Sequence, residues 1–260
     1  MSLASRIHGA HQHGHDRGRV PDHNQDQGGH GRGLSHGPGH GNSHGRAHGH
    51  IDAHANAETP GITLDRSGGY DRFVNAFFAG RRPAVFRKLT RLSGAEPGDH
   101  ALDVGCGTGY LTSMLAAAVA PNGSVTGVDA SAAMVDEASR LRSSAHCTYT
   151  VGAAERLEFD DGRFDVVTSS LMLHHLPTEL RAPALREMRR VLRPGGRLLI
   201  AEFRPPRTGL GRHVVGSITG PAMQEDQRPL LPGLFREAGF GTPHTGDLRP
   251  WITYAIATRD

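Results

Sequence analysis

Residues 102–109, with the sequence LDVGCGTG, constrain the fold more than any other part of the chain. They lie between a short apolar run, typical of a buried strand, and an amphipathic stretch, typical of a helix. Gly105, Gly107 and Gly109 stand at the turn, where residues without a Cβ let the backbone fold tightly and approach a ligand closely. Asp103, just inside the strand, suits a cationic ligand. The sequence therefore predicts a ligand-binding strand–turn–helix unit.

Strand-like and helix-like segments alternate along the rest of the chain. Short apolar segments predict strands, and longer segments with apolar residues at helical spacing predict helices between them. Such alternation is typical of a doubly wound, mostly parallel α/β sheet, whose ligands bind at the carboxyl ends of the strands. The predicted strands are 101–104, 125–128, 147–151, 164–169, 197–203 and 251–258.

Two of the predicted helices have clearly assignable faces. Ser131 is the predicted N-cap of a helix whose apolar face contains Met134, Ala138 and Leu141. The helix before the fifth strand has one apolar and one charged face. On that helix, Leu180, Ala184, Leu185, Met188, Val191 and Leu192 are predicted to face the sheet, and Arg181, Arg186, Glu187, Arg189 and Arg190 to face solvent.

The N-terminal segment 1–60 has a different composition. Twelve of the 18 histidines lie before Ala55, among Gly, Ser, Asn, Asp and Arg, with almost no large apolar residue, so we expect a disordered tail. Closely spaced imidazoles can share a metal ion such as Zn²⁺, Ni²⁺ or Cu²⁺, and the alternative interpretation is a solubilising or pH-responsive tail. The candidate metal ligands are His11, His13, His15, His48 and His50.

Residues 61–260 are long enough for one well-buried domain. Within it, 61–98 is predicted to form a helical cap, with Tyr70, Phe73, Phe77 and Phe78 as lid or core, and 204–229 a Gly- and Pro-rich insert that covers the substrate.

Composition argues against several classes of protein. The formal net charge is only +3, which gives little support for nucleic-acid binding. No apolar run is long enough to span a membrane, and the N-terminus lacks a typical secretion signal. The two cysteines are too few for a disulfide framework. We therefore expect a cytoplasmic protein without a nucleic-acid partner, whose oligomeric state the sequence leaves open.

Asp129 ends the second predicted strand, twenty residues after Gly109. A carboxylate at this position can accept hydrogen bonds from both hydroxyls of a ribose. NAD-dependent enzymes share this arrangement, but Tyr110 stands where their motif has its third glycine, so a pyrophosphate is less well accommodated. The turn and the acid together predict a site for an adenosine-containing ligand.

These segments resemble the class I S-adenosylmethionine-dependent methyltransferases. The turn matches that family's first motif, which holds the methionine end of the cofactor, and Asp129 matches its ribose-binding acid. Segment 152–159 resembles the adenine-binding segment, 164–176 the fourth-strand motif, and 192–199 the turn into the fifth strand. All motifs occur in order, and the similarity is greatest to the quinone-biosynthesis and other small-molecule methyltransferases.

The resemblance implies a Rossmann-like, mostly parallel seven-stranded sheet with helices on both faces and a set of cofactor-binding residues. Ala153 departs from the family, where many members have Asp, so a side-chain contact with the adenine amino group is not expected. Cys106 is interpreted as a small turn residue rather than a nucleophile, since no base is identified beside it. The implied cofactor-binding residues are Asp103, Gly105, Cys106, Gly107, Gly109, Asp129, Ala130, Met134, Ala153, Ala154, Glu155 and Ser170.

The predicted function is transfer of a methyl group from S-adenosylmethionine to a small-molecule acceptor by in-line displacement. This reaction chiefly requires positioning of the two reactants. His174 and His175, at the carboxyl end of the fourth strand, are candidate catalytic bases, or else packing and hydrogen-bonding residues. The alternatives are a metal-handling protein that uses a methyltransferase-like scaffold, and an NAD-dependent enzyme.

Overall fold

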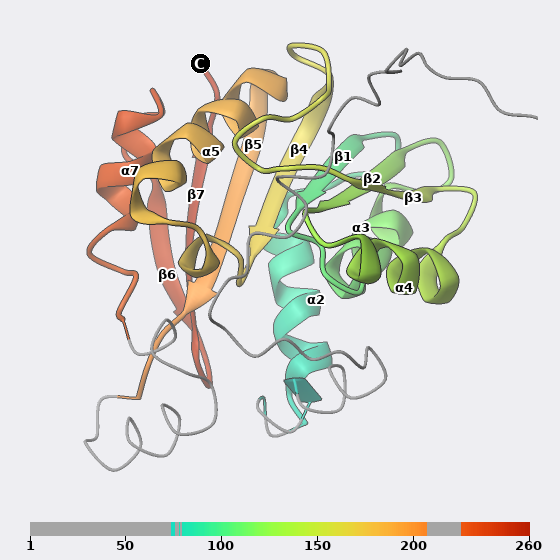
Figure 1. Ribbon diagram of the computed structural model, residues 1–260, viewed down its shortest axis with the longest axis horizontal. Coiled ribbons are helices and arrows are strands. Elements are labelled where there is room, and N and C mark those ends of the chain that lie inside the picture. Colours follow the sequence, from blue (N-terminus) through green and yellow to red (C-terminus); the bar gives the residue numbers. More distant parts are fainter. Residues whose placement is uncertain (1–73, 76–77, 79, 207–224) are drawn as a thin grey trace, which may run out of the picture. The chain divides into compact units, whose positions relative to one another are not determined.

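A computed structural model describes residues 74–75, 78, 80–206 and 225–260. Seven strands form one sheet with the order β3-β2-β1-β4-β5-β7-β6 (Figure 1). Only β7 runs antiparallel to its two neighbours, β5 and β6. The strands are β1 (His100–Val104), β2 (Ser124–Asp129), β3 (Cys147–Val151), β4 (Phe164–Ser170), β5 (Leu192–Phe203), β6 (His244–Leu248) and β7 (Ile252–Thr258).

This strand order confirms the predicted doubly wound sheet. From β1 the chain proceeds outward to β2 and β3, then returns to β4 on the other side of β1. The order therefore reverses between β1 and β4, and in open α/β sheets ligands bind beside the carboxyl ends of the strands at such a point. The helices are α2 (Arg82–Ser93), α3 (Tyr110–Val119), α4 (Ala132–Arg142), α5 (Thr178–Val191) and α7 (Leu231–Glu237), with a short 3₁₀ helix, η1 (Leu173–His175).

Each face of the sheet has its own hydrophobic core. On one face, α2 and α3 pack against side chains such as Ala101 and Leu199. On the other face, α5 and α7 pack against Leu102 and Leu198. Neighbouring residues of β1 and β5 thus enter opposite cores, as expected for strands buried on both faces. Phe78 is fully buried beside Phe86, which confirms a core role for that member of the predicted aromatic group.

The faces of α4 and α5 differ from the predictions at two positions. Ala138 is buried as expected, but Leu141 is 46% exposed, because it lies in the last turn of α4, beyond the edge of the packed face. Arg181 of α5 is buried, not solvent-facing. Its guanidinium donates to the Leu176 carbonyl oxygen at 3.2 Å and to Gln227 Oε1 at 3.4 Å, which replaces the hydrogen bonds lost with water.

Two strands also differ from the sequence-based expectation. β5 begins at Leu192 rather than 197, because the backbone of the Gly195–Gly196 turn pairs with Arg259 and Leu192 pairs with Phe164. The sequence analysis missed β6, whose HTGDL sequence has no apolar alternation. As the outermost strand of the sheet, β6 is held by pairing with β7 rather than by burial of its side chains.

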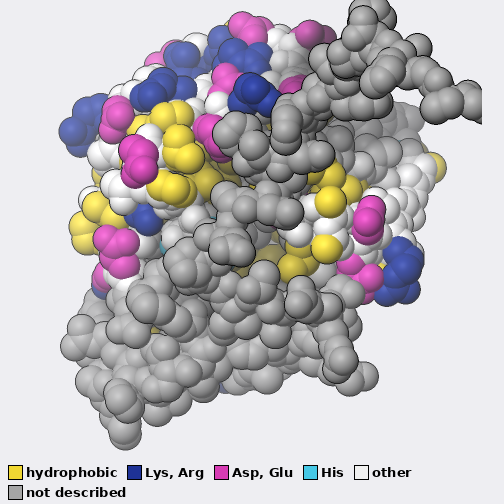
Figure 2. Space-filling view, in the orientation of Figure 1, with side chains coloured by type: hydrophobic (Ala, Val, Ile, Leu, Met, Phe, Trp, Pro, Cys, Tyr) yellow, Lys and Arg dark blue, Asp and Glu magenta, His cyan; other side chains and the backbone are white. Residues whose placement is uncertain are grey.

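The N-terminal tail and most of the 204–229 insert lie outside the described residues, as do Tyr70, Phe73 and Phe77. Among the helices of the described part, none is long and apolar enough to cross a membrane. On the face shown in Figure 2, Lys and Arg side chains are mixed with Asp and Glu side chains over the part of the surface near α5.

Candidate active site

The glycine turn connects β1 to α3 and is fixed against β2. The backbone N–H groups of Gly105 and Cys106 both donate to the Val128 carbonyl oxygen, at 2.8 and 3.0 Å. Gly105, Gly107 and Gly109 have φ values of 72°, 52° and 78°, in the left-handed region that favours glycine. The backbone conformation of the turn therefore favours glycine at all three positions, as the sequence predicted.

Space around the three glycines differs. A Cβ on Gly105 would lie 2.2 Å from Cγ of Met172, and one on Gly109 would lie 2.5 Å from the Tyr149 hydroxyl oxygen. A Cβ on Gly107 would meet no atom of the described residues within 4 Å. The turn is therefore packed at both ends and open at its centre, which leaves room for a ligand to approach the Gly107 backbone.

Asp129, at the end of β2, lies beside this open position. Its Oδ2 accepts a hydrogen bond from the Gly107 N–H at 2.8 Å, and its Oδ1 accepts one from the Ser131 N–H at 2.9 Å. Burial raises the pKa of the carboxyl, and the two N–H donors oppose this rise. Each oxygen still has lone-pair capacity, because a carboxylate offers about four acceptor positions. Asp129 can therefore hold two hydroxyl groups of a ligand in a fixed geometry.

Asp103 lies beneath the turn and is 1% exposed. The Thr112 hydroxyl donates to its Oδ2 at 2.7 Å, and the Thr168 hydroxyl donates to its Oδ1 at 2.8 Å. Burial raises the pKa of Asp103 to about 6, although both threonines lower it, and the nearby Asp129 raises it further. Asp103 therefore contributes a fixed negative charge to the site, while its buried oxygens are not exposed for direct contact with a ligand.

The next part of the candidate site begins at the N-terminus of α4. Ser131 is the N-cap, as predicted, and its hydroxyl accepts from the Met134 N–H at 3.4 Å. Ala130 is exposed and Met134 is half-buried, so both are accessible beside Asp129.

The segment after β3 is also ordered by backbone contacts. Ala153 and Arg156 form a turn in which the Arg156 N–H donates to the Ala153 carbonyl oxygen at 3.2 Å. Ala154 is buried, whereas Ala153 and Glu155 are half-buried. Residues 153–155 therefore offer a bound ligand mainly their backbone groups rather than reactive side chains.

The loop after β4 carries the two candidate bases. Ser170 ends β4 and is half-buried, and Leu171 has a φ of 58°, which is an outlier for a bulky residue. His174 is buried and its Nδ1 lies 2.7 Å from Oε2 of Glu202, whereas His175 is exposed. The two rings pack with a centroid separation of 4.0 Å. His174 and His175, which the sequence analysis treated as equivalent candidates, therefore differ in burial and in hydrogen bonding.

Cys106 is buried, and burial raises the pKa of its thiol, which agrees with its interpretation as a turn residue rather than a nucleophile.

The structure also adds residues that the sequence analysis did not include in the site. Thr112 and Thr168 could have been inferred from the sequence, because hydroxyl groups commonly pair with a buried acid such as Asp103. The long-range contacts of the other added residues have no signal in the sequence. The added residues are Thr112, Tyr149, Thr168, Met172 and Glu202.

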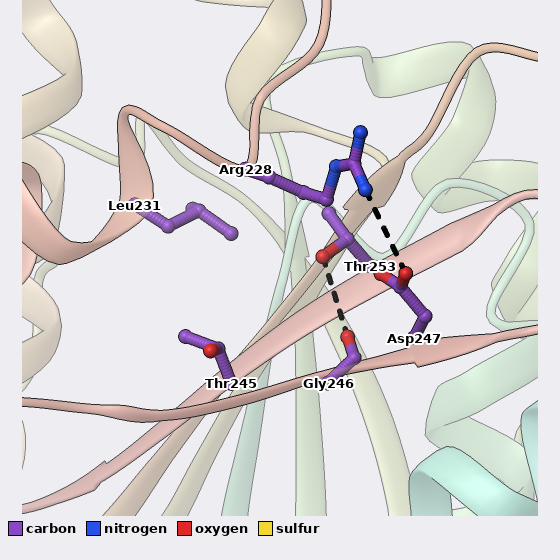
Figure 3. A pocket seen from close by; sticks show the side chains of 6 residues that line it. All are labelled: Arg228, Leu231, Thr245, Gly246, Asp247 and Thr253. Carbon is purple, nitrogen blue, oxygen red and sulfur yellow. Dashed lines mark hydrogen bonds and ion pairs between the residues drawn. The ribbon is translucent and has the colours of Figure 1, made fainter. Parts of the chain in front are cut away.

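A small cleft of about 230 Å³ lies at the opposite edge of the sheet, between the segment that leads into α7 and the β6–β7 pair (Figure 3). Arg228 and Asp247 face each other across it at 3.8 Å. Because β4 and β5 lie between the β6–β7 pair and β1, this cleft is not part of the candidate cofactor site at the glycine turn. Its lining residues are Arg228, Leu231, Thr245, Gly246, Asp247 and Thr253.

No cluster of three or more His, Cys, Asp or Glu side chains suited to a metal ion occurs within 80–206 and 225–260 or the few described residues before them. The tail histidines proposed as metal ligands lie outside the described part of the chain, so their role stays a prediction.

Comparison with solved structures identifies the class of fold. An S-adenosylmethionine-dependent methyltransferase from Aquifex aeolicus aligns with a TM-score of 0.57 at 18% identity, covering 67% of this chain and 89% of that one. A TehB-like methyltransferase from Corynebacterium glutamicum aligns with a TM-score of 0.54 at 18% identity, covering 74% and 97%. The sheet order, the glycine turn and Asp129 thus define a class I, Rossmann-like methyltransferase fold.

Sequence comparison gives the family. Residues 101–196 match the family model described as a methyltransferase domain. A demethylmenaquinone methyltransferase of Symbiobacterium thermophilum is 39% identical over 142 residues, which are 53% of this chain and 55% of that protein. One from Staphylococcus aureus is 38% identical over 138 residues, covering 53% and 56%. The chain therefore contains a methyltransferase domain and resembles the class I S-adenosylmethionine-dependent methyltransferases, above all the quinone-biosynthesis members, and it spans little more than half the length of the curated relatives that it matches.

Proposed function

We propose that this protein transfers a methyl group from S-adenosylmethionine to a small-molecule acceptor. The observation that carries the proposal is the contact between Asp129 and the open Gly107 backbone, at the point where the strand order reverses. The comparisons support it, since residues 101–196 match a methyltransferase domain and a solved S-adenosylmethionine-dependent methyltransferase shares the fold. The match to residues 101–196 includes both halves of the contact.

The chain's residues fit such a cofactor. The Asp129 carboxylate, already oriented by two N–H donors, would accept hydrogen bonds from the ribose hydroxyls. The Gly107 backbone would lie against the methionine end, where the negative charge of Asp103 complements a cationic ligand. The segment from Ala153 to Glu155 would border the adenine. Ala130, Met134, Cys106 and Ser170 complete the proposed contacts.

When bound, the cofactor supplies a methyl group activated by attachment to a positively charged sulfur. The protein has to hold the acceptor in line with that methyl group and exclude water. Within the described part of the site, the loop after β4 carries a buried histidine, His174, whose Nε2 has no hydrogen-bond partner among the described residues. We propose this nitrogen, rather than the exposed His175, as the group that receives the acceptor's proton.

The class of acceptor is suggested by the relatives' name, demethylmenaquinone methyltransferase. We propose that reduced quinones and related phenols are the first compounds to screen. We also propose a cytoplasmic location, with no nucleic-acid partner, in line with the sequence analysis. A single domain over residues 61–260, with the 61–98 cap and the 204–229 insert around the acceptor, completes the proposed organisation.

The test is calorimetric titration of the full, chelator-treated chain with S-adenosylhomocysteine. We expect one-to-one binding, and a loss of at least about 10-fold in affinity for Asp129→Ala, because hydrogen bonds to charged groups contribute about 1.5–3 kcal/mol each. The control is Asp136→Ala, which removes an exposed carboxylate from the neighbouring helix α4 and should bind normally. Absence of saturable binding by the unchanged protein, or binding of NAD in its place, would overturn the proposal.

A further inference from the structure

The loop after β4 contains a strained residue that is held in place from β5. Leu171 has a φ of 58°, a conformation that costs a residue with a Cβ about 1–2 kcal/mol. Its N–H donates to the Ala201 carbonyl oxygen at 2.8 Å. The next two N–H groups, of Met172 and Leu173, both donate to Oε1 of Glu202, at 3.2 and 2.8 Å. Residues 201 and 202 of β5 therefore fix three consecutive backbone groups of this loop.

The second oxygen of Glu202 holds His174. Oε2 lies 2.7 Å from Nδ1 of the ring, and the side chains of His174 and Glu202 are 2% and 0% exposed. The other ring nitrogen, Nε2, is buried and has no hydrogen-bond partner among the described residues. Buried polar atoms are rarely left unpaired, so Nε2, in a loop that lies beside the glycine turn, is available to a bound molecule.

The ionisation state of Glu202 determines where the ring proton lies, because Oε2 of Glu202 and Nδ1 of His174 share one hydrogen bond. Oε1 of Glu202 accepts two N–H groups, and an ionised carboxylate has acceptors only. With Glu202 ionised, Nδ1 of a neutral His174 carries the hydrogen, which leaves a lone pair on Nε2. A protonated Glu202 would give the opposite arrangement, with the hydrogen of the neutral ring on Nε2.

We propose that Glu202 is a positioning residue, which shapes the β4–η1 loop and holds His174 in the Nδ1–H form, so that Nε2 accepts the proton of the methyl acceptor. This inference rests on the proposed function and adds a residue to it. In the reaction, the acceptor's O–H or N–H bond breaks and its proton goes to Nε2. A bond forms from the acceptor to the methyl carbon as the carbon–sulfur bond breaks, and sulfur keeps that electron pair. Water then takes the proton from His174.

Nitrogen-15 NMR of histidine-labelled protein tests the proposal without any acceptor. Long-range nitrogen–proton spectra distinguish the two neutral tautomers, and His174→Gln identifies the signals of His174. We expect the Nδ1–H form in the unchanged protein. In Glu202→Gln, the amide oxygen can still accept the two loop N–H groups while its NH₂ group donates to Nδ1, so we expect the Nε2–H form.

A matched control is Glu187→Gln, which alters another glutamate that accepts a backbone hydrogen bond, from the Leu157 N–H at 2.9 Å. It should leave the His174 tautomer unchanged. Once an acceptor is known, Glu202→Gln should lower kcat by about 100-fold or more, as expected for loss of a general base, with S-adenosylhomocysteine affinity within about twofold of the original.

The unchanged protein alone can overturn the inference, even if Glu202→Gln fails to fold. A His174 signal in the Nε2–H form would show that Glu202 does not hold the ring as proposed. The same holds if the tautomer stays Nδ1–H in a folded Glu202→Gln variant. These outcomes differ from failure of the proposed function, which would appear as absent S-adenosylhomocysteine binding while the tautomer is as expected.

Discussion

The Gly107 backbone N–H donates to Oδ2 of Asp129 at 2.8 Å, so the glycine turn and the acid at the end of β2 form one rigid unit. The Gly105 and Cys106 N–H groups are bound to the preceding residue of β2, Val128. The acid and the open position above Gly107 are thus oriented before any ligand binds. Such preorganisation reduces the entropy that binding has to overcome.

Substitutions at two glycines should separate ligand binding from stability. Gly107→Ala places a methyl group in open space, so we expect at least a 10-fold loss of S-adenosylhomocysteine affinity and only the backbone cost of about 1–2 kcal/mol. Gly109→Ala adds a collision with Tyr149 to the same backbone cost, so its unfolding free energy should fall further. Calorimetric titration and urea unfolding measure the two effects. Equal stability of the two variants would contradict this account.

Asp103 should make the stability of the free protein depend on pH. Its pKa is raised from 3.8 to about 6, so ionisation is less favourable in the folded than in the unfolded chain. The unfolding free energy should therefore fall as pH rises from about 4 to about 6, by about 3 kcal/mol for a shift of about two units.

Urea unfolding between pH 4 and pH 7.5 measures this effect. Asp103→Asn should show a clearly smaller fall in stability, with the remainder due to Asp129, whose pKa is also raised by burial, while Asp136→Asn, which alters an exposed carboxylate, should keep the full fall. Parallel pH curves for the original protein and Asp103→Asn would show that Asp103 is not the cause.

The sequence alone indicated much of the fold, because local signals determine it. The glycine turn, the Ser131 cap and the bounds of β3 are consequences of short segments, and the structure reproduces them. Arg181 and β6 were missed for a different reason. The burial of Arg181 depends on Gln227, 46 residues away, and β6 depends on pairing with β7.

The same distinction applies to the candidate site. Asp103 and Asp129 are evident from their places beside the glycine turn. Glu202 lies 28 residues after His174, and only the pairing of β4 with β5 brings them together. Glu202 is a charged residue within the apolar run 198–203, which indicates a buried acid, but nothing in the local sequence indicates His174 as its partner.

Arg190 should contribute more to stability than the other arginines of α5. Its guanidinium pairs with Glu187 and Asp161 and also donates to the carbonyl oxygens of Phe159 and Leu157, each at 2.8 Å. Arg190→Ala removes all these contacts, so we expect a loss of about 1–3 kcal/mol.

Urea unfolding provides the measurement. The control is Arg186→Ala, on the same helix, which removes one exposed ion pair with Glu237 and should change stability by less than about 0.5 kcal/mol. A comparable loss in both variants would mean that the contact with the 157–161 segment is not responsible.

The buried Asp103 also has a consequence for how much of this protein a cell would contain. A cationic ligand in the site compensates a negative charge that the empty protein holds at a cost, and a ligand that binds only the folded state stabilises it by mass action. The unfolded fraction, which proteases remove, would then decrease as the cofactor becomes more abundant. With Asp103 as one contributor to that affinity, the lifetime of the protein would follow the supply of the proposed methyl donor.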